Sequence, residues 1–127
     1  MRSRILFNEG RLDKLDELVS PTYMLENAPP EIPEGPQAIK HVVSMYRAAF
    51  SDLKITIDDL LAEGDVVAAR STMRGIHTGT FFGISPTGKA VKMASQTMVR
   101  ISNGRLAQSW VSNDLMGLMK QLGVRAA

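Results

Sequence analysis

Apolar positions along the chain change their spacing midway, from a helical pattern to an alternating one. The first half predicts an apolar stub at 5–7, a short helix ended by Pro21, a strand at 23–25, a proline-rich loop at 27–36 and a long helix. Pro36 suits the first turn of that helix. The apolar face of the short helix consists of Leu12, Leu15, Leu18 and Val19. The apolar face of the long helix consists of Ile39, Val42, Val43, Tyr46 and Phe50.

The second half predicts strands at 53–57, 66–76, 89–101 and 105–111, with turns at 63–65 and 102–104 and a loop at 77–88. Asn103-Gly104 is a strong hairpin signal. Asp114 then caps a last helix that ends at Gly123. Helices followed by an antiparallel meander and a closing helix indicate an α+β fold. A curved sheet wrapped by helices leaves room for a pocket on its concave face.

Composition narrows the classes of protein that fit this pattern. The 127 residues suit one domain, and 44% hydrophobic with 22% charged residues is ordinary for a globular chain. The absence of cysteine and the presence of only two histidines lead us to expect no metal site. The net charge of +2 is spread along the chain, so we expect no nucleic-acid partner. Apolar runs are too short for a membrane span or a signal segment, which predicts a cytoplasmic protein.

Two residues are candidates for proton transfer. Asp114 stands where the last strand meets the last helix, and it is either an N-cap or a carboxylate at the mouth of an apolar pocket. His77 ends a strand, and it either orients a substrate carbonyl or is a turn histidine bonded to nearby backbone. His41 lies off the apolar stripe of its helix and is expected at the surface.

Further residues are candidates for ligand contact. Gln96, Met98 and Arg100 share one strand face, while Arg70 and Arg74 share another that we expect to meet solvent. A pocket arginine that stabilises an oxyanion is the alternative. The methionines at 73, 93 and 98 either line a pocket for a flat ligand or fill the core. Trp110 is the only tryptophan and is suited to stacking on an aromatic ligand.

The segment 74–89 reads R-G-x-H-T-G-x-F-x-G-I-x-P-T-G-K, and supporting matches occur at 7–10, 15–19, 46–53, 99–101, 104–105, 110, 114–115 and 121–123. On these residues nearly the whole chain resembles the SnoaL-like polyketide cyclase (ester cyclase) family. The resemblance implies the cone-shaped α+β fold of the nuclear transport factor 2-like superfamily. Residues 1–127 are expected to form one domain of this family. Relative to family members the first helix, at 1–7, is short. We therefore expect a pocket that is less covered or is completed by a dimer partner.

The family resemblance also implies an activity. Members close a ring in a polyketide by intramolecular aldol condensation, without cofactor or metal, and Asp114 occupies the position of their acid/base aspartate. His77 and Gln96 are then expected to hydrogen-bond carbonyl or enolate oxygens of a small, hydrophobic, carbonyl-rich ligand. Glu26 and Ser109 stand where members often have histidine, and Glu26 is a possible carboxylate partner. The predicted substrate-binding residues are Gln96, Met98, Trp110, Tyr46, Met73 and Glu26.

Three alternatives stay open. Glu26 and Ser109, where family members often have histidine, favour a small-molecule-binding module without catalysis. The second alternative is an isomerase or hydrolase, because the same fold also hosts these enzymes. The third alternative is an assembly role, because a curved sheet has an outer face suited to a homodimer. The alternating residues Val91, Met93, Val99 and Ile101 fit either a core or such an interface.

Overall fold

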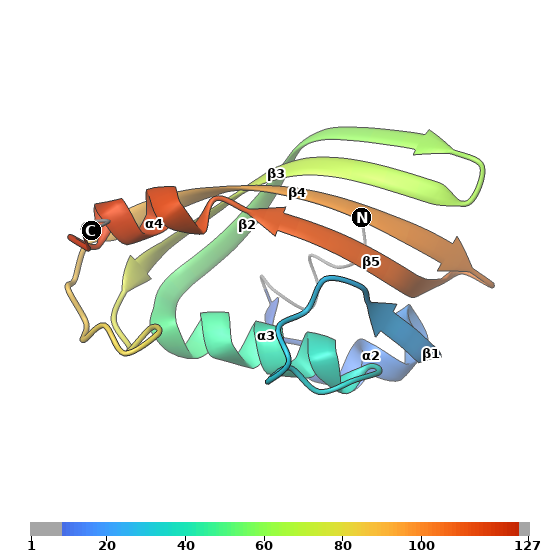
Figure 1. Ribbon diagram of the computed structural model, residues 1–127, viewed down its shortest axis with the longest axis horizontal. Coiled ribbons are helices and arrows are strands. Elements are labelled where there is room, and N and C mark those ends of the chain that lie inside the picture. Colours follow the sequence, from blue (N-terminus) through green and yellow to red (C-terminus); the bar gives the residue numbers. More distant parts are fainter. Residues whose placement is uncertain (1–8, 125–127) are drawn as a thin grey trace.

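A curved sheet folds over one long helix in the computed structural model, which describes residues 9–124 (Figure 1). The helical elements are a 3-10 turn (Leu12–Lys14), α2 (Leu15–Leu18), α3 (Gln37–Ala49) and α4 (Leu115–Gln121). The strands are β1 (Val19–Leu25), β2 (Phe50–Glu63), β3 (Val66–His77), β4 (Ala90–Ser102) and β5 (Arg105–Asn113). The α+β class is confirmed, and the predicted stub at 5–7 lies outside the described residues.

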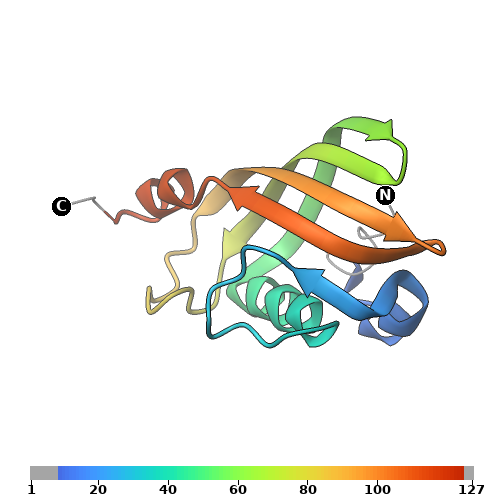
Figure 2. The same cartoon turned by 45° about the vertical axis from the view of Figure 1, so that its right-hand side comes forward.

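The sheet has five strands in the order β1-β5-β4-β3-β2. Strands β2 to β5 form the predicted antiparallel meander, and β1 pairs in parallel with β5 at the edge. Helix α3 lies under the concave face, and α4 continues from β5 beyond the end of the sheet (Figure 2). The sheet is therefore curved and mostly antiparallel, with helices on its inner side and a closing helix at its end, as expected.

The two faces of the sheet differ in polarity because side chains alternate along each strand. On β4, Val91, Met93 and Val99 are buried on the inner face, while Lys92 and Gln96 on the outer face are exposed. The pairing register aligns these inner positions with inner positions of β3 and β5. The concave face is thus largely apolar.

Two groups of buried residues flank the centre of the domain. One group joins the end of α3 to the inner face of the sheet and α4, and includes Tyr46, Phe50 and Leu118. The other joins α2, β1 and the start of α3, and includes Tyr23 and Val43. Because residues from both groups line the same cavity, the space between these two cores is the natural place for a ligand.

Two predicted helix ends were wrong, and the strand predicted at 53–57 extends from Phe50 to Glu63. Val19 begins β1 rather than ending a helix, because the 3-10 turn and a four-residue helix leave it with extended backbone angles of −125° and 132°. Phe50 begins β2 rather than ending α3, although its N–H still donates to the Tyr46 carbonyl. Because this bond is of the helical i to i−4 type, the helical spacing of apolar residues continues up to Phe50. The spacing therefore predicted Phe50 as part of the apolar face of the helix. The edge position of β1 also tolerates Pro21 within the strand.

In the part of the chain that the structure describes, no helix is long and apolar enough to cross a membrane.

Candidate functional site

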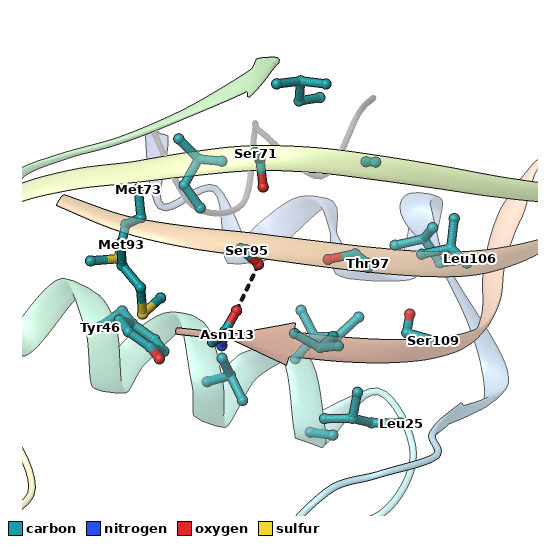
Figure 3. Close-up of a pocket in the computed structure, with 18 of the residues that line it drawn as sticks. Leu25, Tyr46, Ser71, Met73, Met93, Ser95, Thr97, Leu106, Ser109 and Asn113 are labelled. Carbon is teal, nitrogen blue, oxygen red and sulfur yellow. Dashed lines mark hydrogen bonds between the residues drawn. The ribbon is translucent and has the colours of Figure 1, made fainter. Parts of the chain in front are cut away.

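A cavity of about 160 Å³ lies between the concave face of the sheet and α3 (Figure 3). Most of its wall is apolar, with Met73 and Met93 from the sheet and Val42 from α3. Leu25 of β1 and Leu106 of β5 close it on the side of the second core. Such a cavity suits a ligand with large apolar surfaces.

A set of polar side chains interrupts this apolar wall. Ser71, Ser95 and Asn113 occupy paired positions on the neighbouring strands β3, β4 and β5, so they form one row across the sheet. The Ser95 hydroxyl donates a 2.6 Å hydrogen bond to the Asn113 side-chain oxygen (Figure 3). The polar residues in the wall are Tyr23, Tyr46, Ser71, Ser95, Thr97, Ser109 and Asn113. These groups can meet ligand oxygens at a few defined points.

Two buried tyrosines reach the cavity from opposite cores. Burial raises the pKa of the Tyr46 phenol, and a hydrogen bond with Asn113 partly offsets that rise. Burial likewise raises the pKa of Tyr23, with a partial offset from its hydrogen bond with Ser109. Because the ordinary value is about 10, both phenols keep their protons at neutral pH. Each can therefore act as a neutral hydrogen-bond donor or acceptor.

The part of the cavity wall that the structure describes carries no formal charge. Among the described residues that line it, none is an aspartate, glutamate, histidine, lysine or arginine. Within residues 9–124 there is also no group of three or more His, Cys, Asp or Glu side chains arranged to hold a metal ion. The wall as described can bind an uncharged, oxygen-bearing ligand through hydrogen bonds and apolar contact.

Asp114 lies just beyond this cavity, at the junction of β5 and α4. Its side-chain oxygen accepts a 2.9 Å hydrogen bond from the Gly117 N–H, so it caps α4 as the sequence predicts. Its own N–H donates to the Ala94 carbonyl. The residue is exposed and is not part of the cavity wall, although the preceding residue, Asn113, is.

His77 lies at the end of β3, outside the cavity wall. Its ring is fully buried against Phe50, with ring centroids 5.6 Å apart. Its Nδ1 accepts a 3.2 Å hydrogen bond from the backbone N–H of Thr87. The structure therefore has the backbone contact that the sequence analysis gave as one of two interpretations of this histidine.

The six predicted substrate-binding residues divide between three places. Tyr46 and Met73 line the cavity. Gln96, Met98 and Trp110 lie on the outer face of the sheet, where they border a shallow groove with Leu61 and Arg70. The face of β4 that carries Gln96 and Met98 thus points away from the cavity.

Glu26 lies at the edge of the sheet, just after β1. Its carboxylate accepts a 2.8 Å hydrogen bond from Gln108, and its N–H donates to the Ser109 carbonyl. Arg70 is exposed and pairs with Asp59 at 2.6 Å, and Arg74 is exposed on the same face, as expected. His41 is also exposed, as the sequence predicts.

Sequence reasoning missed most of the polar wall. Ser95 and Thr97 share a strand face with Val91, Met93 and Val99, and this alternation was visible in the sequence. Polar residues within an apolar strand face are the signal that identifies them, because a face buried against helices is otherwise apolar. Asn113 lies beside Asp114 and belongs to the same strand face as Ser109 and Val111.

Comparisons with known proteins agree with this fold. A family model described as SnoaL-like polyketide cyclase matches residues 2–122. A nogalonic acid methyl ester cyclase of Streptomyces nogalater is 31% identical over 123 residues, covering 92% of this chain and 89% of that protein. The solved structure of TsrD from Streptomyces laurentii is 32% identical, with a TM-score of 0.86 over 94% of this chain and 88% of that one. Wild-type IdmH from Streptomyces antibioticus is 32% identical, with a TM-score of 0.82 over 96% and 94%.

Proposed function

Because the chain belongs to the SnoaL-like polyketide cyclase family, we propose that it binds a flat, carbonyl-rich, polyketide-like molecule in its cavity and closes a ring in it. The observation that carries the proposal is the largely apolar cavity with a row of hydrogen-bonding side chains along one wall. Apolar walls hold the carbon skeleton in a folded conformation, and polar points fix the oxygens. Holding two reacting carbons close together supplies a large part of the acceleration in an intramolecular closure.

The proposed reaction is an intramolecular aldol addition that needs no cofactor. A base removes a proton from the carbon beside one carbonyl, and the resulting enolate carbon bonds to a second carbonyl carbon. The new alkoxide oxygen takes up a proton, so the product is an isomer of the substrate. The proposed proton carrier is Asp114, which follows Asn113 at the end of the cavity-lining strand. A ligand that meets Asp114 must extend past Asn113 towards α4.

Conversion of nogalonic acid methyl ester, the substrate named for the relative, tests this proposal. The expected product has the same mass as the substrate and a different chromatographic retention. Asp114→Asn removes the base but retains a good N-cap, so it is expected to lower turnover by roughly 100-fold or more without a change in stability. Glu34→Gln, which neutralises another exposed carboxylate in the loop before α3, is the matched control. Unchanged turnover in Asp114→Asn would remove Asp114 from the mechanism.

A second candidate function is binding without catalysis. The absence of an aspartate, glutamate, histidine, lysine or arginine among the described lining residues favours it, because proton transfer at carbon requires a base within reach of the substrate. In that case the wild-type chain binds the methyl ester but returns it unchanged after prolonged incubation. Binding together with isomerisation would instead establish the cyclase.

The proposed assembly is a homodimer formed through the outer face of the sheet. Leu61, Ala68, Met98 and Trp110 are paired across four strands and form one apolar row, in which Leu61 is 73% and Met98 48% exposed. The β2 end of this row is acidic, with Asp58, Asp59 and Glu63, whereas β5 contains no acidic residue. A twofold axis parallel to the strands would place the acidic end of one copy over β5 of the other.

A further inference from the structure

The side-chain amide of Asn113 has a defined orientation. Ser95 and Asn113 are paired residues of β4 and β5, and the serine hydroxyl donates to the amide oxygen at 2.6 Å. A hydroxyl proton can bond to the amide oxygen but not to its nitrogen, because the nitrogen has no free lone pair. The bond therefore leaves the NH₂ group of Asn113 free to face another partner (Figure 3).

The phenol of Tyr46 comes from α3 on the opposite side of the cavity, and its interaction with the Asn113 side chain lowers the phenol pKa, as a donated hydrogen bond does. Since the amide NH₂ can only donate, the phenol oxygen is the acceptor of this hydrogen bond. The hydroxyl proton of Tyr46 is not used by Asn113 and remains available for donation. Because Asn113 uses the phenol as an acceptor, the role left for a ligand is that of hydrogen-bond donor.

The ring of Tyr46 is held firmly in place. It stacks on Phe50 with centroids 6.3 Å apart and contacts Phe81 at 5.5 Å. Only 5% of the residue is exposed, although its side chain lines the cavity. Burial raises the pKa of the phenol, so the proton stays on the oxygen at neutral pH. A fixed, neutral donor in an apolar cavity selects for a hydrogen-bond acceptor on the ligand.

We propose that Tyr46 donates its hydroxyl proton to a carbonyl oxygen of an aromatic ketone bound in the cavity, with Ser95 and Asn113 as positioning residues. This inference rests on the proposed function, because it assigns a hydrogen-bond partner to the ligand class named there. It also applies to binding without catalysis. During ring closure the same donor would stabilise the negative oxygen that develops on the enolate or the alkoxide.

Tyr23 is the competing donor within the cavity. Its partner Ser109 lies four residues before Asn113 on the same face of β5, a separation of about 13 Å at the rise of a β-strand. Serine can either donate or accept, so its bond does not determine where the Tyr23 proton points. The two phenols therefore mark separate ends of the cavity, and one ligand carbonyl can engage only one of them.

Fluorenone and fluorene form a suitable pair of ligands for the test. They share one flat tricyclic shape, but fluorenone has a carbonyl where fluorene has a methylene group. Calorimetric titration of the full chain is expected to show that both bind. Tyr46→Phe keeps the stacked ring and removes only the hydroxyl, so fluorenone affinity is expected to fall roughly fivefold while fluorene affinity stays the same. The carbonyl stretch of bound fluorenone should also move to higher frequency in this variant, since a hydrogen bond lowers it.

Variants of the positioning residue separate this role from a purely structural one. Ser95→Ala is expected to weaken fluorenone binding about twofold and leave fluorene binding unchanged, because Asn113 loses its orienting bond. Ser95→Thr keeps a hydroxyl and should restore the wild-type preference.

The outcomes distinguish the two proposals. If neither compound binds the wild-type chain, the proposed function fails and the inference fails with it. If both bind but Tyr46→Phe weakens both equally, the cavity function stands and the donor role of Tyr46 is overturned. A loss specific to fluorenone in Tyr23→Phe, with none in Tyr46→Phe, would assign the carbonyl to the other phenol and equally overturn the inference.

Discussion

The backbone N–H of Thr87 donates a hydrogen bond to Nδ1 of His77 and so fastens the loop after β3 to the end of that strand. The loop is also held by the Gly88 N–H to the His77 carbonyl and by the His77 N–H to the Lys89 carbonyl. Because Nδ1 accepts, the proton of the neutral ring resides on Nε2, which is buried with no partner among the described residues. In this structure His77 anchors a loop outside the cavity wall.

Replacing His77 tests this anchoring role. His77→Ala removes both the loop bond and the contact with Phe50, so the free energy of unfolding is expected to fall by about 3 kcal/mol. His77→Phe keeps a ring in the same space and should recover part of the loss. Urea unfolding followed by circular dichroism measures both. Wild-type stability in the alanine variant, together with weaker fluorenone binding, would instead indicate contact with the ligand.

Gly79 in the same loop is expected to tolerate no side chain. A Cβ at this position would overlap the carbonyl oxygen of Ala48, and the N–H groups of Thr78 and Gly79 both donate to the neighbouring Ala49 carbonyl. Gly79→Ala should therefore destabilise the fold by about 3 kcal/mol. Gly83→Ala is the control, because nothing lies within 4 Å of a Cβ added there. Only the φ of +78° at Gly83 is unfavourable for alanine, which costs about 1 kcal/mol. Equal losses in thermal unfolding would show that crowding at Gly79 is unimportant.

The buried tyrosines predict a loss of stability at high pH. The pKa of Tyr46 and of Tyr23 is raised by burial, so above about pH 10 the unfolded chain has released phenol protons that the folded chain still holds. The unfolded state then binds fewer protons, and the free energy of unfolding falls as pH rises. Urea titrations from pH 8 to 11 measure the slope. The slope should be shallower in Tyr46→Phe, and an identical slope would argue against burial of this phenol.

The cap formed by Asp114 makes a separate contribution to stability. Asp114→Ala leaves the Gly117 N–H without its partner and is expected to destabilise the chain by about 1 kcal/mol. Asp114→Asn keeps an acceptor oxygen and should unfold close to the wild-type temperature. A large loss of stability in the asparagine variant would mean that any change in turnover reflects misfolding rather than the missing base.

The apolar row on the outer face predicts a measurable change in assembly. Met98→Lys places a charge in the middle of the row and is expected to convert the proposed dimer to a monomer in sedimentation experiments. Ala94→Lys adds the same charge to the same face of β4 but outside the row, and should leave the dimer intact. A monomeric wild-type chain at high concentration would rule out this interface.

Strand alternation and turn residues predicted the sheet well because each signal is local. Asn103 and Gly104 form the turn between β4 and β5, and Asp114 caps α4. The full length of β2 was not predictable, since register shifts near Asp52 and Asp58 interrupt the two-residue period. The parallel pairing of β1 with β5 joins segments more than 80 residues apart, and no local pattern contains that information.

The site was harder to predict than the fold because it depends on which face of each strand points inward. The alternation of side chains along β4 places Met98 and Met93 on opposite faces of the strand. Only the position of α3 shows that the face with Met93 is the one towards the cavity. The signal from Ser95 was present as a polar residue on an apolar face. Its partner Asn113 becomes recognisable only through the register of β4 with β5.

The edge of β5 is closed by a side chain that acts as a short piece of strand. The side chain of Asn27 donates to the Val111 carbonyl at 2.6 Å and accepts from the Val111 N–H at 3.1 Å, across 84 residues of sequence. Contacts this distant are slow to form, because the intervening chain must be ordered first. Strand β1 also supplies part of the cavity wall, through Tyr23 and Leu25. A ligand inside the cavity would therefore stabilise the docked position of β1 against the sheet.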